Sequence, residues 1–195
     1  MASRPAVEGK KALEEAERSR NTKDLTLAQY AAARDYIIVS LTRSVGTRPG
    51  ALEAATIGQW KAAQWDANKK AKVMLVTSHK REVDGPAPIP CDQWITRDLQ
   101  VFLTKLRPLV CGHSSDSGKL FLKSDDAPYQ KGTIGRRITA FVLKSGVRTD
   151  RPISATDFRK WLVTVMRTQK RAGVPINEGL LRRLMCHSDD TAQTW

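Results

Sequence analysis

The sequence predicts a mainly α-helical domain with one small β-hairpin sheet, an α+β helical bundle. Most apolar residues recur at the three- and four-residue spacing of amphipathic helices. Residues 71–91 instead change period: Val73 and Leu75 alternate with Met74 and Val76, and Asp-Gly and three prolines follow. Asp-Gly is a strong turn signal, and proline in a strand is confined to edges, so this segment is expected to form the hairpin.

The N-terminal boundary of the domain is expected near residue 25. Residues 1–24 are polar with clustered basic charges, and they predict a flexible segment or a frayed helix. Thr26 with Gln29 forms a capping box ahead of a helical apolar pattern that ends near Gly46. The folded domain is therefore expected over 25–195, with this helix as its first core element.

The other helices follow from the same signals. Pro49 is suited to the first turn of a helix, and Pro108 ends an apolar helical pattern. Gly146 ends a second such pattern, and Ser154 with Asp157 forms the cap that begins a third. Phe158 and Trp161 are interpreted as core residues. "GKLFLKS" indicates a brief extended segment. Further helices are thus expected at about 49–55, 95–106, 134–145, 155–169 and 175–186.

Charge indicates the class of partner. Lysine and arginine number 33 against 20 acidic residues, a net charge of +13, and such an excess favours a polyanion such as nucleic acid. A basic surface that only confers solubility is the alternative. No stretch reaches the roughly 18 apolar residues of a membrane span, and the N-terminus lacks the apolar centre of a signal peptide. A soluble intracellular protein without a membrane partner is expected.

Cysteine usage favours reduced thiols. Cys91, Cys111 and Cys186 are an odd and widely separated set, unlike a disulfide framework. Cys111 and His113 form a C-x-H pair, but no second pair has metal-ligand spacing. No metal site is expected.

Two arginines are candidates for a phosphate clamp. Arg48 lies at the junction of two expected helices, and Arg159 comes one helical turn after Thr156. Converging guanidinium groups can each donate two hydrogen bonds to phosphate oxygens, although sequence spacing cannot show that they converge. Lys80, near the hairpin tip, could reach the same phosphate.

Four segments, in this order, resemble those of the tyrosine recombinases, also called phage integrases, over about residues 26–195. "SVGTRPGALEAATIGQW" resembles the segment with the first catalytic arginine, and "VTSHKREVDGPAPIP" resembles the hairpin with the catalytic lysine. "ISATDFRKWLVT" is similar to the His-x-x-Arg helix, and "LLRRLMCHSDDTAQTW" to the Gly-His-Ser motif. The resemblance implies a recombinase-like helical bundle and the catalytic residues Arg48, Lys80, Thr156, Arg159 and His187.

The hairpin refines the resemblance. His-Lys followed by Gly-Pro-Ala is closer to eukaryotic mobile-element recombinases than to bacterial ones. Arg81 is the nearest rival to Lys80. The less certain DNA-binding candidates are Arg43, Arg81 and Lys160.

The sequence departs from the family pattern at several positions. Thr156 stands where histidine or lysine is usual, and it cannot act as a proton-transfer base. Ala51 stands where many relatives have an acid, so Glu53 is expected to support Arg48 instead. The family's nucleophilic tyrosine comes nine residues after the histidine, which corresponds to position 196, one residue beyond Trp195.

The resemblance implies DNA strand cleavage and rejoining, as in site-specific recombination or integration, through a 3′-phosphotyrosyl intermediate. It implies no nucleotide cofactor and no metal, double-stranded DNA as partner, and a homo-tetramer on DNA. The location would be nuclear in a eukaryote and otherwise cytoplasmic. This chain alone is expected to be inactive without the tyrosine.

Other interpretations remain open. A domesticated or truncated module that binds DNA without cutting it explains Thr156 and the missing tyrosine equally well. Type IB topoisomerases share the chemistry but fit the intervals less well, and no RNA-binding signature is present. The arginines could be solvated helix residues, Lys80 could protect a sheet edge, and His187 could be a helix-end residue.

Overall fold

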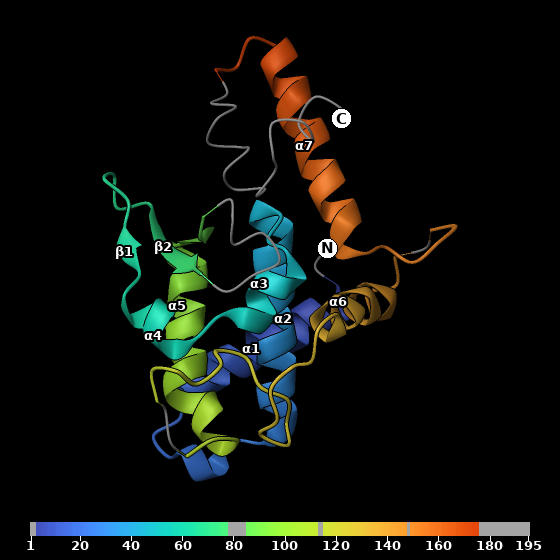
Figure 1. Cartoon of the computed structure of the whole chain (residues 1–195). Coiled ribbons are helices and arrows are strands. Elements are labelled where there is room, and N and C mark those ends of the chain that lie inside the picture. Colours follow the sequence, from blue (N-terminus) through green and yellow to red (C-terminus); the bar gives the residue numbers. More distant parts are fainter. Residues whose placement is uncertain (1–2, 78–84, 113–114, 148, 176–195) are drawn as a thin grey trace.

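The computed structural model describes residues 3–77, 85–112, 115–147 and 149–175. Within these ranges the chain is mainly helical, with one small sheet (Figure 1), which confirms the predicted class. None of the described helices combines the length and apolar character needed to cross a membrane. The helices are α1 (Arg4–Arg18), α2 (Leu27–Val45), α3 (Pro49–Ala54), α4 (Ile57–Lys61), α5 (Gln93–Val101), α6 (Thr133–Lys144) and α7 (Ala155–Arg171). The strands are β1 (Gln64–Trp65), β2 (Ala71–Val76) and β3 (Ala87–Asp92).

Helix α2 is the centre of the bundle, and α1, α5, α6 and α7 all pack against it. The predicted capping box is present: Thr26 accepts a hydrogen bond from the Gln29 N–H, and the Gln29 side chain accepts one from the Thr26 N–H. Gly46 ends α2 in the left-handed conformation with φ 65°, which glycine adopts without a steric penalty. Both ends of the central helix were therefore predicted correctly.

The N-terminal segment packs more tightly than its composition predicted. Residues 4–18 form α1, which rests on α2 through a narrow face of mostly small side chains. Gly9 makes the approach possible, because a Cβ there would lie 2.3 Å from the Tyr36 Cβ and 2.8 Å from the Ala32 carbonyl oxygen. The expectation of a flexible or frayed segment was wrong for α1, since three small residues and one leucine are too weak an apolar signal. The buried face consists of Gly9, Ala12, Leu13 and Ala16.

The sheet is antiparallel in the order β1-β2-β3, so β3 is an edge strand as predicted. Pro88 pairs with Leu75, and Pro90 pairs with Val73. Proline has no N–H, so the ladder donors of β3 must come from alternate residues, and an outer edge with prolines is a poor template for another strand. The two-residue strand β1 extends the expected hairpin and is too short to leave a periodic signal.

The helix predicted to stop at Pro108 has three parts. Helix α5 continues as a π-helical turn, Phe102–Leu106, and then as a 3₁₀ turn, Arg107–Leu109. Arg107 is buried and donates from Nη2 to the Lys119 carbonyl at 2.9 Å. This bond fixes the start of the predicted extended segment, whose Leu120, Phe121 and Leu122 are buried.

A buried charge network joins α2 to α6. Arg34 is 1% exposed and lies near the rings of Tyr30 and Tyr129, with its Nη1 donating to the Leu122 carbonyl at 3.0 Å. Its Nε donates to Asp35, which also accepts two hydrogen bonds from Arg137 of α6. Asp35 therefore neutralises a buried arginine and holds the two helices together.

Helix α7 projects from the bundle (Figure 1). Its first turns contact α2 and α6, and Ala155 and Arg159 are its buried residues. Phe158 packs partly buried against the core, whereas Trp161 is 55% exposed. The assignment of Trp161 to the core was wrong, because an amphipathic pattern shows which side of a helix is apolar but not how much of its length is covered.

Substituting Gly9 with alanine tests the close packing of α1. We expect Gly9→Ala to lower the free energy of unfolding by about 1–3 kcal/mol, because the added methyl group collides with the α2 backbone. Helix propensity alone predicts the opposite sign, a gain of about 0.5–1 kcal/mol. Gly50→Ala in α3 is the control, since its Cβ meets no described atom within 4 Å and only the gain applies. Chemical denaturation measures both, and a Gly9→Ala chain as stable as the parent would contradict the packing.

Candidate functional site

The beginnings of three helices, α3, α6 and α7, border one pocket of about 590 Å³. Among its lining residues are four basic side chains, one carboxylate and three hydroxyl groups. The basic residues are Arg48, Lys131, Arg136 and Arg159, the acid is Glu53, and the hydroxyl groups belong to Thr139, Ser154 and Thr156. Arg48 from one predicted motif, and Thr156 and Arg159 from another, therefore line the same pocket.

Arg48 enters the pocket from the turn between α2 and α3. It is the N-cap residue of α3, with extended backbone angles φ −69° and ψ 134°, and Pro49 occupies the first helical turn. Proline fits there because a first-turn N–H has no helical partner. Gly46 and Arg48 thus bracket a sharp change of direction that brings the arginine to the pocket wall.

Arg159 enters from α7 and is 8% exposed. Its Nη1 donates a hydrogen bond of 2.7 Å to the carbonyl oxygen of Gly46, the residue that caps α2. The orientation of Arg159 and the turn before Arg48 are therefore set by one shared contact. Sequence spacing could not show this link, which is made through backbone far away in the chain.

Thr156 is exposed in the first turn of α7 and lines the pocket. The helix start is held by Asp157, whose carboxylate accepts from the Ser154 N–H at 2.8 Å and the Ser154 hydroxyl at 2.7 Å. Arg151 donates both guanidinium branches to the same carboxylate. These hydrogen bonds, that of Arg151 first, hold the pKa of Asp157 below its ordinary value.

Glu53 joins α3 to the start of α6. Its Oε2 accepts from the Gly132 N–H at 3.1 Å, and its Oε1 accepts from the Ile134 N–H at 3.0 Å. Ala51 is 2% exposed in the core. Glu53 already accepts hydrogen bonds from N–H groups at the start of α6, so these groups are not open to a bound anion. We therefore attribute the anion-binding capacity of the pocket to its basic side chains more than to the N-terminus of α6.

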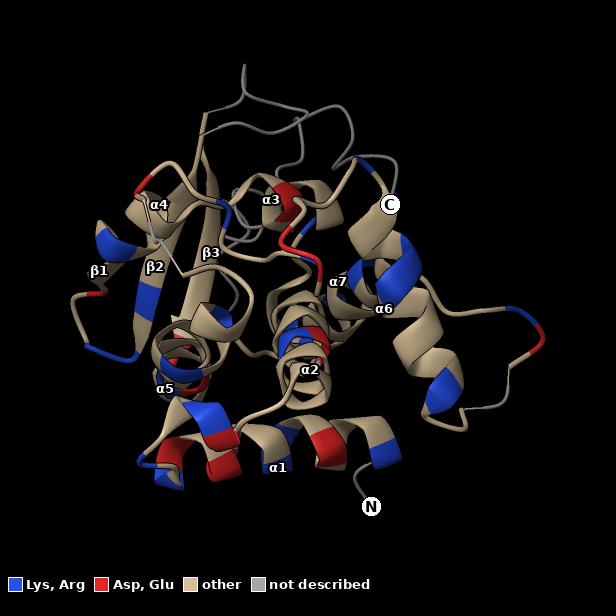
Figure 2. Cartoon of the chain, turned by 90° about the horizontal axis from the view of Figure 1, so that it is seen from below, with Lys and Arg blue, Asp and Glu red and all other residues tan. Residues whose placement is uncertain are grey.

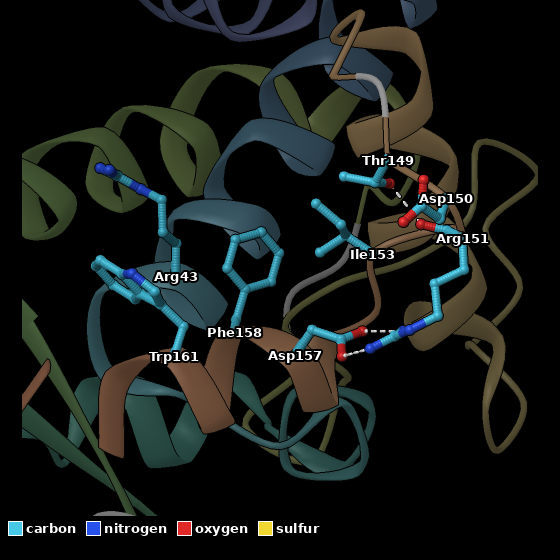
Figure 3. Close-up of a pocket in the computed structure, with 8 residues that line it drawn as sticks. All are labelled: Arg43, Thr149, Asp150, Arg151, Ile153, Asp157, Phe158 and Trp161. Carbon is cyan, nitrogen blue, oxygen red and sulfur yellow. Dashed lines mark hydrogen bonds and ion pairs between the residues drawn. The ribbon is translucent and has the colours of Figure 1, made fainter. Parts of the chain in front are cut away.

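The other predicted residues lie elsewhere or are not described. Lys80, Arg81 and His187 fall outside the described residues. Lys160 is exposed on α7. Arg43 lines a separate pocket of about 680 Å³, where its side chain lies on the same side as Phe158 and Trp161, across from the Arg151–Asp157 pair (Figure 3).

Two pocket residues were missed from the sequence, Lys131 and Arg136 at the start of α6. Helix α6, residues 133–144, contains basic residues and no acidic one, and this bias is a usable signal for Arg136, whereas Lys131 precedes the segment. Neither residue lies in one of the four motif segments.

The tyrosines of the chain, three in number, do not line the pocket. Burial raises the pKa of Tyr30 and Tyr36, and it raises that of Tyr129 to about 12. All three are therefore neutral at neutral pH, and none is placed as a phenolate nucleophile for this site.

Among the described residues, cysteine and metal chemistry add no second site. Burial raises the pKa of the free thiol of Cys91 to about 12, so this thiol is protonated and unreactive. Cys111 is partly exposed, and Cys186 lies outside the described residues. Within the described ranges, no three His, Cys, Asp or Glu residues are grouped closely enough to hold a metal ion.

Solved recombinase structures share this fold. The crystal structure of XerA recombinase matches with a TM-score of 0.58 at 18% identity, over 96% of this chain and 56% of that chain. XerH site-specific recombinase bound to difH substrate, in a pre-cleavage complex, matches with a TM-score of 0.62 at 14% identity, over 93% and 46%. Its post-cleavage complex with palindromic difH substrate gives 0.61 at 14% identity, over 93% and 45%.

These matches confirm the predicted fold, a helical bundle like the tyrosine recombinase catalytic domain. The chain spans about half the length of the recombinases it matches. No protein-family model and no curated protein matches the sequence.

Replacing Asp157, the third residue of the capping box at Ser154, tests how the start of α7 is held. We expect Asp157→Asn to lower the free energy of unfolding at pH 7 by about 1 kcal/mol, as for other lost caps. The pKa of Asp157 is lowered in the folded state, so its stabilisation is present above the unfolded value, about pH 4, and decreases as pH falls below it. Denaturation at pH 7 and pH 2.5 should show the difference between the two chains shrinking, and an unchanged difference would exclude the charge as its cause.

Proposed function

We propose that this chain is the catalytic domain of a tyrosine recombinase, which binds double-stranded DNA and holds one backbone phosphate between α3, α6 and α7. The observation that carries the proposal is the pocket shared by Arg48 and Arg159. Two forked guanidinium groups that meet at one point can bind the non-bridging oxygens of a single phosphate. The net charge of +13 supports a polyanionic partner.

The neighbouring structures support the same class of partner. One of them is a recombinase crystallised with its difH substrate before and after cleavage. The finer assignment, to mobile-element recombinases of eukaryotes that act in the nucleus, rests only on the His-Lys and Gly-Pro-Ala letters of the hairpin. Assembly into a tetramer on DNA is likewise part of the proposal.

In the proposed reaction, Arg48 and Arg159 stabilise the added negative charge on a pentavalent phosphorus. A tyrosine at position 196 supplies the nucleophile: its phenolic proton passes to solvent, its oxygen forms a bond to phosphorus, and the bond from phosphorus to the 5′ oxygen breaks. Lys80 donates a proton to that leaving oxygen, and His187 hydrogen-bonds the phosphate. Energy is conserved in the phosphotyrosyl bond, so the reverse attack by a 5′-hydroxyl rejoins the strand.

Thr156 gives weight to a second candidate function, a recombinase-like module that binds DNA without cutting it. Thr156 is exposed at the pocket, where its hydroxyl can donate to a phosphate oxygen or position a water. It cannot accept a proton as histidine does at this position in the family. Cleavage by this chain therefore depends on the arginines, Lys80 and His187 without a general base at Thr156.

Covalent trapping tests the proposed function. The chain is extended by tyrosine at position 196 and incubated with duplexes that carry random sequence around a nick, so that the released strand diffuses away and rejoining is blocked. We expect a phosphotyrosyl adduct on a denaturing gel, absent when position 196 is phenylalanine. Arg48→Ala in the extended chain should slow adduct formation about 10²–10³-fold, the usual cost of losing a preorganised donor to a developing oxyanion.

Lys61→Ala is the matched control, because Lys61 is exposed and paired with Asp116 at 2.7 Å, away from the pocket. It should leave adduct formation unchanged. DNA binding without an adduct would favour the non-catalytic module and make Thr156 the suspected lesion. Absence of any salt-dependent duplex binding would contradict both candidate functions.

A further inference from the structure

The outer side of α6 carries basic residues without acidic ones (Figure 2). Lys131 precedes the helix, Arg136 lies in its first half and Lys144 ends it, and all three side chains are exposed. We call these three residues the α6 strip. None of them has an ion pair among the described residues, and the hydrogen bond found for Arg136 goes to the neutral hydroxyl of Thr133 at 3.3 Å.

The strip connects two hollows. Lys131 and Arg136 line the pocket that contains Arg48 and Arg159. Arg136 and Lys144 line the adjoining pocket of about 720 Å³ between α1, α2 and α6. Because Arg136 borders both, a basic path runs along the helix from the proposed phosphate pocket into the second hollow.

The carboxylates of the second hollow are already neutralised. Glu8 accepts a hydrogen bond from Arg4 at 2.8 Å. Asp35 accepts from Arg34 and from Arg137, so Arg137 is bound within the fold and is not available to a ligand. The unpaired charge that remains there, among the described residues, belongs to Arg136 and Lys144.

We propose that the α6 strip binds the backbone of the DNA next to the phosphate held by Arg48 and Arg159. This inference rests on the proposed function. With a rise of 1.5 Å per residue, Arg136 and Lys144 are about 12 Å apart along the helix axis. One DNA strand carries a phosphate about every 3.4 Å along its axis, so a single strand running along α6 presents several phosphates to the strip.

Phosphate contacts of this kind position the duplex without reading its sequence. The strip would therefore fix the direction in which the strand leaves the pocket, and it would hold the scissile phosphate in register with the two arginines. Its contribution should be similar on any duplex, and it should decrease with salt because bound phosphates release counterions.

Salt-dependent binding to a mixed-sequence duplex tests the proposal. Replacing Lys131, Arg136 and Lys144 together by alanine should reduce the slope of log K against log salt concentration by about 2.7, from about 0.9 for each phosphate contact. The control replaces Lys11, Arg18 and Lys61, whose charges are paired with Glu15, Glu14 and Asp116. It removes the same net charge and should change the slope far less.

The possible outcomes distinguish a failure of the α6 strip from a failure of the proposed function. A slope that falls equally in both triple variants would overturn the strip and indicate a general effect of net charge. An unchanged slope in the α6 variant, while Arg48→Ala still weakens binding, would also overturn it and leave the proposed function intact. If the parent chain shows no salt-dependent binding, the proposed function itself fails. Denaturation of each variant confirms that it is folded.

Discussion

The hydrogen bond from Arg159 to the Gly46 carbonyl is the contact on which the candidate site depends. Gly46 is the left-handed residue that ends the central helix α2, and the chain turns there toward Arg48 and α3. Arg159 donates a hydrogen bond of 2.7 Å to that carbonyl oxygen, which links the start of α7 to the turn that carries Arg48. A buried guanidinium that is also hydrogen-bonded loses little further freedom when a ligand arrives, which favours tight anion binding.

Caps and ion pairs stabilise the frame around this contact. Glu53 fixes α6 to α3, and the pairing of Asp157 with Arg151 holds the first turn of α7. Asp35 joins α2 to α6 through two arginines. Each of these three carboxylates is already hydrogen-bonded to a partner within the fold. None of them is therefore left without a partner beside the basic side chains of the pocket. The pocket lining therefore has four basic side chains and one carboxylate, and that carboxylate is hydrogen-bonded to the backbone of α6.

Much of the fold followed from local signals in the sequence. The capping box at Thr26, the glycine stop at Gly46 and the edge prolines of β3 each act within a few residues, and the structure has all of them. The packing of α1 and the exposure of Trp161 could not be predicted in the same way. They depend on how closely a partner helix approaches and how far it extends, which Gly9 and the length of α7 decide in three dimensions.

At the candidate site, too, some residues could be identified from local sequence and others depend on tertiary packing. Motif order singled out Arg48, Thr156 and Arg159, and the structure places all three at one pocket. Lys131 and Arg136 belong to no motif and reach the pocket only because α6 begins there. Glu53 was expected to support Arg48, and in the structure it accepts two backbone hydrogen bonds at the start of α6. The motif residues could be predicted, whereas the position of Lys131 and Arg136 at the pocket, which tertiary packing sets, could not.

The central claim is that Arg48 and Arg159 together hold one DNA phosphate, and a structure of this chain bound to a short duplex tests it most directly. The account predicts a backbone phosphate within hydrogen-bonding distance, about 2.7–2.9 Å, of both guanidinium groups, between α3, α6 and α7. A duplex bound on another face, with no phosphate near either arginine, would contradict it.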